Sequence, residues 1–560
     1  MKHKRYLPLV LITLLAAFLR FFDLGHLPVS PNWDEVSHGY NAYSILKTGM
    51  DEWGKSFPLI FRAFGDYKLP LYIYLTVIPV WLFGLNVFAV RFISALAGTL
   101  AVPGIYFLTK LLFPNRQLPI NRFSIGLAYF AAIFLVFSPW HFFISRPALE
   151  ANLSLTLIIW GSFYLLKFAK GQTSFLSSAI LLGLSLHTYN TARIFVPLLL
   201  ISFFIIYRPK IKINVKNILG GLFLVLTFGI VLYQVYLGEG TARYDKLKIL
   251  SESTVFQIGQ QRTKSHLPSP LAKAVYNRPV FFITTAAKNY FGYFSPDFFS
   301  QKYGAQSQFA IPNQSLLTLP VFLLAFLGFF TYLGRVKTNQ DFQFLYTWLF
   351  LSPVAASLTI DPPQALRPNP MIPAIIILGS LGLSRLLIVI PPKKQLLFTS
   401  LILFLFLISF SFYLKQYTSE YKTKYSSSWQ YGYEQVMTYI NEHGQEYEKI
   451  FITKRYGEPH IFYAFFKKLD PLKLQPGPGN IRFGKSNWFW TDKIDNLYFV
   501  NDWQIPTTSV SELPLESGGE ISTQRSLLIT SPDHLPVNAH VIQIIRFLDG
   551  SPAFIITSIP

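Results

Sequence analysis

The sequence predicts a polytopic α-helical membrane protein with about eleven transmembrane helices, range roughly 10–13, and a C-terminal extracytoplasmic α/β domain. The 560 residues are 51% hydrophobic and only 14% charged, whereas soluble proteins have about 25% charged residues. Apolar runs of about 17–25 residues recur over the first 414 positions, and each is long enough to cross a bilayer. From Lys415 onward, short helical and strand-like patterns replace these runs.

One kind of loop is short, basic and almost free of acidic residues. Such loops connect every second pair of neighbouring spans. By the positive-inside rule these loops lie in the cytoplasm, as does the N-terminus. They cover residues 1–5, 110–122, 167–172, 208–216, 335–340 and 391–394. The predicted spans are roughly 6–24, 88–112, 123–143, 151–169, 174–190, 192–207, 217–237, 314–334, 342–360, 371–390 and 395–414. This odd number of spans predicts a multi-pass protein of the plasma membrane whose C-terminus is outside.

One apolar stretch, KLPLYIYLTVIPVWLFGLN (68–86), would reverse every later loop if it crossed the membrane. We therefore expect an interfacial helix there, since Tyr and Trp favour the membrane surface. The outer loops are then 25–87 and 238–313. The first span follows the basic MKHKR and lacks a small-residue cleavage site, so we expect it to be retained rather than removed as a signal peptide.

The formal net charge of +21 comes from the membrane part of the chain. Residues 415–560 contain 14 Lys or Arg and 15 Asp or Glu, so the basic excess lies beside the apolar spans. This distribution argues against a nucleic-acid-binding protein and for loops oriented by the membrane. The absence of cysteine excludes disulfides, thiolate metal sites and a cysteine nucleophile.

The segment 415–560 predicts a small α/β domain, distinct from a membrane domain at 1–414. A helical pattern covers 430–444, and KIFIT, RSLLITS, HVIQIIRFL and AFIITSI have the composition of strands. QPGPG (475–479) is expected to be a loop.

Polar residues collect at the predicted outer ends of several spans. They are Asp34, Glu35, His38 and Tyr40 after the first span, Arg146 and Glu150, then His187, Tyr189 and Arg193, then Asp297, and finally Arg367. Each has an ordinary interpretation: a solvated loop charge, a snorkelling arginine, or an acid at a helix N-terminus. Their shared side of the membrane predicts that they line one cavity.

Three motifs resemble the GT-C membrane glycosyltransferases, in the branch of protein O-mannosyltransferases and the lipid A aminoarabinose transferase. They are NWDEVSHGYNAYSILKTG, GDYKLPLYIYLTVIPVWLFGLNVFAVRFISALAGTL and FSPWHFFISRPALEANLSL. GLSLHTYNTARIFVPLLL, NYFGYFSPDFF and QALRPNPMIPAI resemble uncharacterised bacterial and archaeal members of that branch. The resemblance covers about residues 5–414.

The resemblance implies transfer of a sugar from a polyprenyl-phosphate donor to an acceptor hydroxyl on the outer face, with inversion. Asp34 matches the general base, and Glu35 the second acid of that motif. Tyr67 and Lys68 match contacts to the donor phosphate, and Arg146, Arg193 and Arg367 match it more loosely. Glu150 stands where the family often has Asp, which leaves open whether it binds a divalent metal ion (Mg²⁺ or Mn²⁺) with Asp34. His38, Tyr40, His187, Tyr189 and Asp297 are the candidate substrate-lining residues.

General chemistry agrees with these roles, because a carboxylate can take the hydroxyl proton and cations stabilise a leaving phosphate. No nucleotide-binding glycine loop occurs, so we expect no nucleotide cofactor. The expected partners are the lipid-linked donor, membrane lipids and a protein, lipid or glycan acceptor. Two alternatives remain: a transporter or flippase of a lipid-linked sugar, which predicts midplane charges and inverted repeats, and a non-catalytic envelope assembly protein, in which Asp34 would be dispensable.

Overall fold

The computed structural model describes residues 6–114, 116–120, 123–210, 212–239, 246–302, 306–360 and 363–560. The chain divides into two compact units. The first contains residues 1–20, 96–145 and 150–413, and the second contains 21–95, 146–149 and 414–560. Because α1, α4 and α20 run from one unit into the other, each unit combines distant parts of the sequence.

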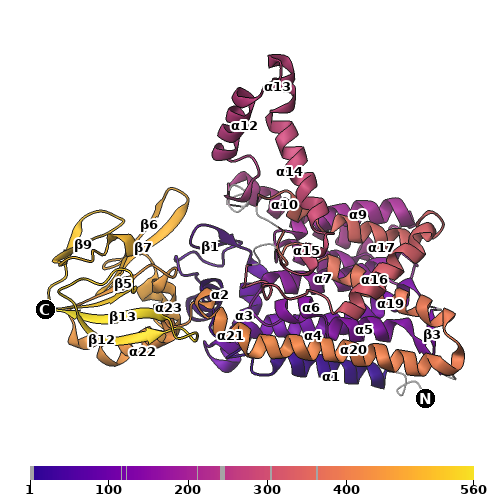
Figure 1. Ribbon diagram of the computed structural model, residues 1–560, viewed down its shortest axis with the longest axis horizontal. Coiled ribbons are helices and arrows are strands. Elements are labelled where there is room, and N and C mark those ends of the chain that lie inside the picture. The colour runs from indigo at the N-terminus through magenta and orange to yellow at the C-terminus, as the bar shows by residue number, and fades with distance from the viewer. Residues whose placement is uncertain are drawn as a thin grey trace. The chain divides into compact units, whose positions relative to one another are not determined.

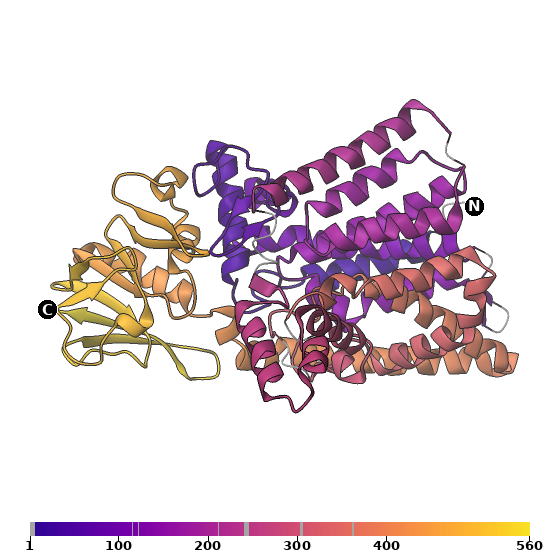
Figure 2. The same cartoon turned by 90° about the horizontal axis from the view of Figure 1, so that it is seen from above.

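The first unit is a bundle of apolar helices (Figures 1 and 2). Its long helices are α1 (Leu7–Phe21), α4 (Val87–Leu112), α5 (Leu127–Val136), α7 (Glu150–Ala169), α8 (Leu176–Leu186), α9 (Ala192–Tyr207), α10 (Val215–Tyr236), α16 (Leu319–Tyr332), α17 (Gln340–Leu351), α19 (Met371–Val389) and α20 (Pro392–Thr418). Its shorter elements are β3 (Gln117–Ile120), β4 (Phe123–Gly126), α6 (Pro139–Ile144), α12 (Glu252–Lys264), α13 (Ser269–Val275), α14 (Arg278–Gly292), α15 (Pro296–Phe299), η2 (Leu333–Lys337) and α18 (Val354–Ser357). A helix thus occurs at the place of each predicted span.

Six helical segments in the described part of the chain are long and apolar enough to cross a membrane. They are Val87–Leu112, Glu150–Ala169, Val215–Tyr236, Leu319–Lys337, Met371–Val389 and Pro392–Lys424. The predicted multi-pass helical membrane protein is therefore confirmed. Several other apolar helices are shorter, among them α1, α8 and α9, so the number of spans and their orientation stay predictions.

Two predicted spans are divided into consecutive helices. The segment 123–143 forms α5 and α6, which are separated before Pro139, and Ser138 caps α6 through a 3.4 Å hydrogen bond from the His141 amide. The segment 342–360 ends α17 at Leu351 and resumes as α18 after Pro353. Proline lacks the amide proton that a continuous helix needs, which explains both divisions.

A very close helix contact in this unit joins α16 and α19 through glycines. A Cβ atom on Gly328 would lie 2.0 Å from the carbonyl oxygen of Leu378, and one on Gly382 would lie 1.9 Å from that of Leu324. Only glycine permits the two backbones to approach this closely. Inside a bilayer no hydrophobic effect drives helices together, so close van der Waals packing between small residues holds them.

The second unit joins the first loop to the C-terminal residues. Its first-loop elements are α2 (Trp33–Thr48), β1 (Phe61–Arg62), β2 (Tyr67–Lys68) and α3 (Pro70–Phe83). Its C-terminal helices are α21 (Glu420–Lys424), η3 (Ser427–Trp429), α22 (Tyr433–His443), η4 (Gly444–Glu446), α23 (Pro459–Lys467), α24 (Pro471–Leu474) and η5 (Asp502–Gln504). Helix α3 covers the stretch predicted to lie at the interface, and that placement stays a prediction.

A seven-stranded mixed sheet forms the core of the C-terminal residues, with strand order β12-β13-β11-β5-β8-β7-β6. The strands are β5 (Lys449–Thr453), β6 (Ile481–Lys485), β7 (Trp488–Ile494), β8 (Leu497–Val500), β11 (Ser526–Thr530), β12 (His540–Arg546) and β13 (Pro552–Ile559), and β9 (Glu512–Pro514) pairs separately with β10 (Glu520–Ser522). β5 lies parallel to both β8 and β11, and the other neighbours are antiparallel. The predicted α/β fold is confirmed, although β6, β7 and β8 were not expected.

Alternating residues of the central strand contact opposite sides of the sheet. Phe451 packs with Leu513 and Leu528 in one apolar cluster. On the other side, Ile450 lies beside Gly444, which follows α22. Both faces are covered, in agreement with the three consecutive apolar residues at the middle of the central strand, Ile450–Ile452.

Candidate active site

Helix α2 begins at the predicted acidic pair, and its first turn fixes both carboxylates. The Asn32 side chain accepts a hydrogen bond from the Glu35 amide (2.9 Å), and the Glu35 carboxylate accepts one from the Asn32 amide (3.2 Å). This reciprocal capping box satisfies two amides that have no partner within the helix. Asp34 lies in the same turn, where the helix dipole favours negative charge.

Asp34 and Glu35 have very different surroundings. The Asp34 side chain is 40% exposed, and its Oδ1 lies 2.6 Å from the Nζ atom of Lys68, which is almost buried on β2. The Glu35 side chain is 1% exposed. Asp34 is therefore the member of the pair that solvent or a substrate can reach.

The Glu35 carboxylate is fully engaged inside the protein. Its Oε1 accepts hydrogen bonds from Arg91 Nε (2.9 Å) and the Ala148 amide (2.7 Å). Its Oε2 accepts from Arg91 Nη2 (3.0 Å). Arg91 is completely buried and also donates to the carbonyl oxygens of Leu24, Pro28 and Ser30. Glu35 thereby ties α2 to α4, to the chain that enters α2 and to residues 146–149.

Arg91 was not predicted as a site residue, although the sequence carried a signal for it. It is a charged residue within the predicted span 88–112, and such residues are costly unless they are paired.

The remaining predicted residues of the first loop mostly face the protein interior. His38 is buried with its ring 5.3 Å from that of Tyr72, and the buried Tyr40 hydroxyl donates to the Leu469 carbonyl (3.0 Å). Tyr67 is half-buried with its ring edge against Phe489 (5.8 Å). These contacts make His38 and Tyr40 parts of the core rather than of an open pocket.

Arg146 likewise has contacts within the second unit. Its Nη2 donates to the carbonyl oxygens of Phe22 (2.7 Å) and Leu27 (3.2 Å), and its guanidinium lies 5.6 Å from the centre of the Tyr417 ring. Arg146 therefore holds the chain that leaves α1.

Aromatic residues surround the first turn of α2. Trp33 stacks on Phe64 at 5.5 Å between ring centres and lies 6.3 Å from Trp488 of β7. The indole of Trp488 donates to the buried Glu458 carboxylate (2.7 Å). A Cβ atom on Gly457 would lie 2.5 Å from the Trp33 ring, so glycine is required there. The C-terminal residues thus supply part of the surroundings of Trp33, the first residue of α2.

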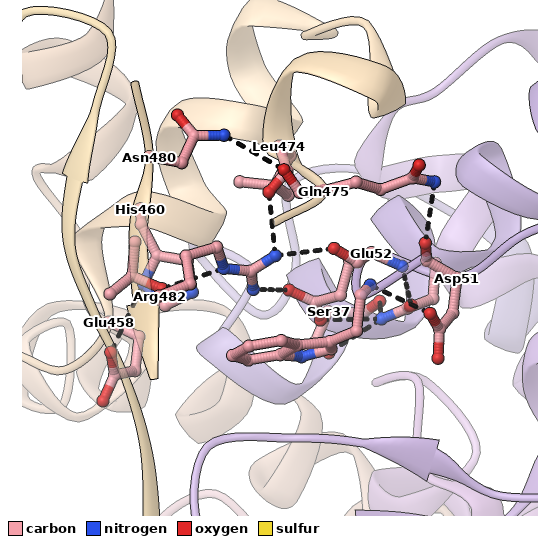
Figure 3. A network of polar contacts seen from close by, with 12 residues as sticks. Ser37, Asp51, Glu52, Glu458, His460, Leu474, Gln475, Asn480 and Arg482 are labelled. Carbon is pink, nitrogen blue, oxygen red and sulfur yellow. Dashed lines mark hydrogen bonds and ion pairs between the residues drawn. The ribbon is translucent and has the colours of Figure 1, made fainter. Parts of the chain in front are cut away.

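A buried ion pair attaches the β6–β7 hairpin to the first loop (Figure 3). Arg482 Nη2 donates to the Glu52 carboxylate (2.8 Å), and Nη1 donates to the carbonyl oxygens of Glu52 (2.6 Å) and Leu474 (3.0 Å). The Gln475 amide also donates to the Asp51 carbonyl (3.2 Å). Burial lowers the pKa of the Arg482 guanidinium, and the Glu52 carboxylate opposes that shift.

The first unit contains a separate basic cavity of about 330 Å³. Tyr189, Arg193, Thr359 and Arg367 supply polar groups, and Val231 and Val235 supply apolar ones. Arg367 donates to the Thr359 hydroxyl (2.7 Å), and Arg193 donates to the Gln234 amide oxygen. Two guanidinium groups beside apolar side chains are suited to an anion that carries a hydrocarbon chain.

Other predicted residues do not line this cavity. His187 contacts the carbonyl oxygen of Thr227 through Nε2 (3.2 Å). Asp297 is a half-buried residue of the short helix α15, and the half-buried Glu150 begins α7. Within the described ranges, no group of three or more His, Asp or Glu side chains is arranged to hold a metal ion. The described His, Asp and Glu side chains thus offer no three-ligand metal site.

Residues 68–233 match a family model described as dolichyl-phosphate-mannose-protein mannosyltransferase. No curated protein matches the chain. Among solved structures, ArnT from Cupriavidus metallidurans bound to undecaprenyl phosphate is similar at 12% identity and a TM-score of 0.51, over 98% of this chain and 97% of that one. The Archaeoglobus fulgidus oligosaccharyltransferase in complex with Zn and sulfate has 14% identity and a TM-score of 0.49, over 82% and 61%. The arabinofuranosyltransferase AftD from Mycobacteria has 11% identity and a TM-score of 0.41, over 100% and 40%.

The match to the family model includes Lys68, α3, α4 and the helices up to α10. At 12% identity, the similarity to ArnT shows a shared fold over nearly the whole length of both chains. Together they agree with the resemblance noted in the sequence: residues 68–233 match the mannosyltransferase model, and the chain shares its fold with ArnT.

Proposed function

We propose that the protein transfers a sugar from a polyprenyl-phosphate donor to an acceptor hydroxyl on the extracytoplasmic face, with inversion. The hydroxyl oxygen attacks the anomeric carbon, the bond from that carbon to the phosphate oxygen breaks, and polyprenyl phosphate leaves. Asp34 takes the hydroxyl proton. The observation that carries this assignment is the accessible Asp34 carboxylate beside the almost buried Lys68 ammonium. A fixed carboxylate is the usual base for such a proton transfer.

Glu35 has a positioning role in this proposal. Its four hydrogen bonds leave no accessible oxygen for an acceptor. It instead fixes the first turn of α2, and with it the direction of the Asp34 side chain. Lys68 orients the Asp34 carboxylate and is the candidate cation for the donor phosphate on this unit, beside Tyr67.

We also propose that the basic cavity of the first unit is a separate site for a lipid-linked phosphate, which Arg193 and Arg367 would contact, with Tyr189 beside them. The apolar residues of its wall suit the first isoprene units of the carrier. ArnT, which shares the fold, was crystallised with undecaprenyl phosphate.

We further propose that residues 1–414 are the membrane domain and that residues 415–560 form an outer domain for the acceptor. In that arrangement the N-terminus is cytoplasmic, as the basic loops indicate. The acceptor is a protein, a lipid or a glycan.

The test measures sugar transfer from a panel of radiolabelled polyprenyl-phosphate sugars in membranes that contain wild type or Asp34→Asn at matched levels. The control is Glu516→Gln, which changes another carboxylate of the same unit that is paired with a lysine (Lys485, 2.7 Å). We expect Asp34→Asn to lose at least about 100-fold in rate, as for removal of a general base, and the control to keep its activity. Equal rates for wild type and Asp34→Asn would exclude Asp34 as the base. A wild type inactive with every donor would count against the proposed transfer.

A further inference from the structure

Helices α12, α13 and α14 form an arm that stands away from the helical bundle of the first unit. We define the lateral arm as residues 252–292. Figure 1 shows α14 running across the direction of the long helices, and Figure 2, turned by 90°, agrees with this arrangement. The arm joins the bundle where α14 packs against α18. It therefore extends sideways at the level of one end of the membrane-crossing helices.

The arm is an ordered part of the fold. At its base, the Tyr290 hydroxyl donates to the Phe350 carbonyl (2.9 Å), and the Asn289 amide donates to the Thr359 carbonyl (2.8 Å). Within it, Arg262 donates through Nη2 to the Tyr276 carbonyl (2.7 Å). Such contacts fix the direction of α14 relative to the bundle.

Large apolar side chains of the arm are exposed. Phe256, Leu271 and Ile283 are 67%, 54% and 64% exposed, and Phe291 is 70% exposed. Ile283 and Phe291 are eight residues apart on α14, so they lie on one face of the helix, with Ala287 between them. A contiguous apolar face of this kind is unfavourable in water and marks an interaction surface.

The charge of the arm is almost entirely basic. Between residues 252 and 292 there are five Lys or Arg residues, namely Arg262, Lys264, Lys273, Arg278 and Lys288, against the single acid Glu252. An amphipathic helix that is rich in Lys and Arg and lies in the plane of the membrane binds anionic lipid, because its apolar face enters the acyl boundary while its cations meet the phosphates.

We propose that the lateral arm docks on the anionic phospholipid surface of the membrane beside the bundle. Three observations favour this partner: the arm extends sideways from a membrane-crossing bundle, its apolar residues are exposed, and its charge is opposite to that of anionic headgroups. Docking would fix the position of α14. Because the Asn289 side chain donates to the Thr359 carbonyl, it would also fix Thr359 at the wall of the basic cavity. The proposal does not depend on the sugar-transfer reaction.

The chain contains no cysteine, so a single introduced cysteine reports on one place in the full-length protein. Ile283→Cys carries an environment-sensitive fluorophore, and the protein is placed in nanodiscs of phosphatidylcholine with or without phosphatidylglycerol. Val541→Cys on β12 is the control, since Val541 is an apolar residue of similar exposure (50%). We expect the fluorophore of the Ile283→Cys variant to show a blue shift and quenching by nitroxide-labelled headgroups in the anionic discs only, and the control fluorophore to show no change.

A second variant adds Lys264→Gln, Lys273→Gln and Arg278→Gln to Ile283→Cys. Each basic residue near an anionic surface contributes about fivefold to binding, so their loss should lower the ratio of docked to undocked arm about 100-fold. High salt should act in the same direction. A water-like emission in both kinds of disc would overturn the proposal. So would an equal blue shift in neutral discs, or a shift that requires a second copy of the protein.

Discussion

Exchange of Glu35 for Gln should lower the unfolding temperature of the second unit more than exchange of Asp34 for Asn. Glu35→Gln keeps the shape of the side chain but removes the charge that neutralises Arg91, which is fully buried. It also places an amide nitrogen where the carboxylate accepts hydrogen bonds from backbone amides. Breaking a buried ion pair on one side costs about 3–5 kcal/mol, because the other charge stays buried without compensation.

This free energy corresponds to a large change in the melting temperature. The second unit contains roughly 200 residues, and for that size 1 kcal/mol lowers the melting temperature by about 2–4 °C, so we expect a decrease of roughly 6–20 °C. Asp34→Asn removes one partner of the almost buried Lys68, but the Asp34 side chain is 40% exposed, so water reaches the pair and the expected cost is below that of Glu35→Gln. The two adjacent variants thus differ in their effect on stability, and Glu35→Gln has the larger one.

The assay is thermal unfolding of purified protein in detergent, followed by tryptophan fluorescence, with sugar transfer measured on the same samples at low temperature. Trp429 lies 6.0 Å from the Arg91 guanidinium and is one of the ten tryptophans that contribute to this signal. A double variant, Glu35→Leu with Arg91→Met, should recover part of the lost stability because no buried charge remains. An unchanged melting temperature for Glu35→Gln, or a larger decrease for Asp34→Asn, would refute the assignment of Glu35 to positioning and Asp34 to chemistry.

Three further predictions concern other contacts. Arg482→Met should leave Glu52 as an unpaired buried carboxylate and detach the β6–β7 hairpin, so limited proteolysis should release the C-terminal residues at least about tenfold faster than in wild type. Gly328→Ala should destabilise the bundle by at least about 1–3 kcal/mol in thermal unfolding because its Cβ would meet backbone, whereas Gly221→Ala, which meets nothing within 4 Å, should not. Burial raises the pKa of Asp51, so ionisation of this carboxyl costs stability as the pH rises above about 4. Asp51→Asn should therefore raise the melting temperature at pH 7 relative to wild type, and this difference should vanish at acid pH.

The sequence predicted the membrane-crossing helices well because their signal is local. A continuous apolar run with basic residues at one end is sufficient to place a helix, and α7, α10 and α19 begin and end within about two residues of their predicted limits. The prolines at 139 and 353 did not by themselves predict that the helices divide there, since membrane helices often tolerate proline. Strands β6 and β7 were missed because their half-buried aromatic residues follow no simple alternation.

The sequence predicted which residues belong to the candidate site but not the contacts between them. Motif resemblance selected Asp34 and Lys68 without indicating that their side chains are in contact. It did not distinguish the burial of Asp34 from that of Glu35, because burial depends on residues that are distant in sequence. Arg91 lies 56 residues after Glu35, and Arg482 lies 430 residues after Glu52. No spacing rule links such pairs, so the attachment of the hairpin to the first loop had to come from the structure.

The separate environments of Asp34 and Glu35 follow from the geometry of the helix that they begin. Consecutive residues of an α-helix point about 100° apart, so one adjacent carboxylate can face the buried Arg91 while the other contacts Lys68 and remains open to solvent. Both belong to a first turn that is held by its capping box, and the buried acid therefore fixes the rotation of the turn that directs the exposed one. The proposed transfer would require the base to be held within a fraction of an ångström of the attacking hydroxyl. A rigid, charged anchor one residue away meets that requirement more directly than a flexible loop would, so the proposed roles give both members of the acidic pair a purpose.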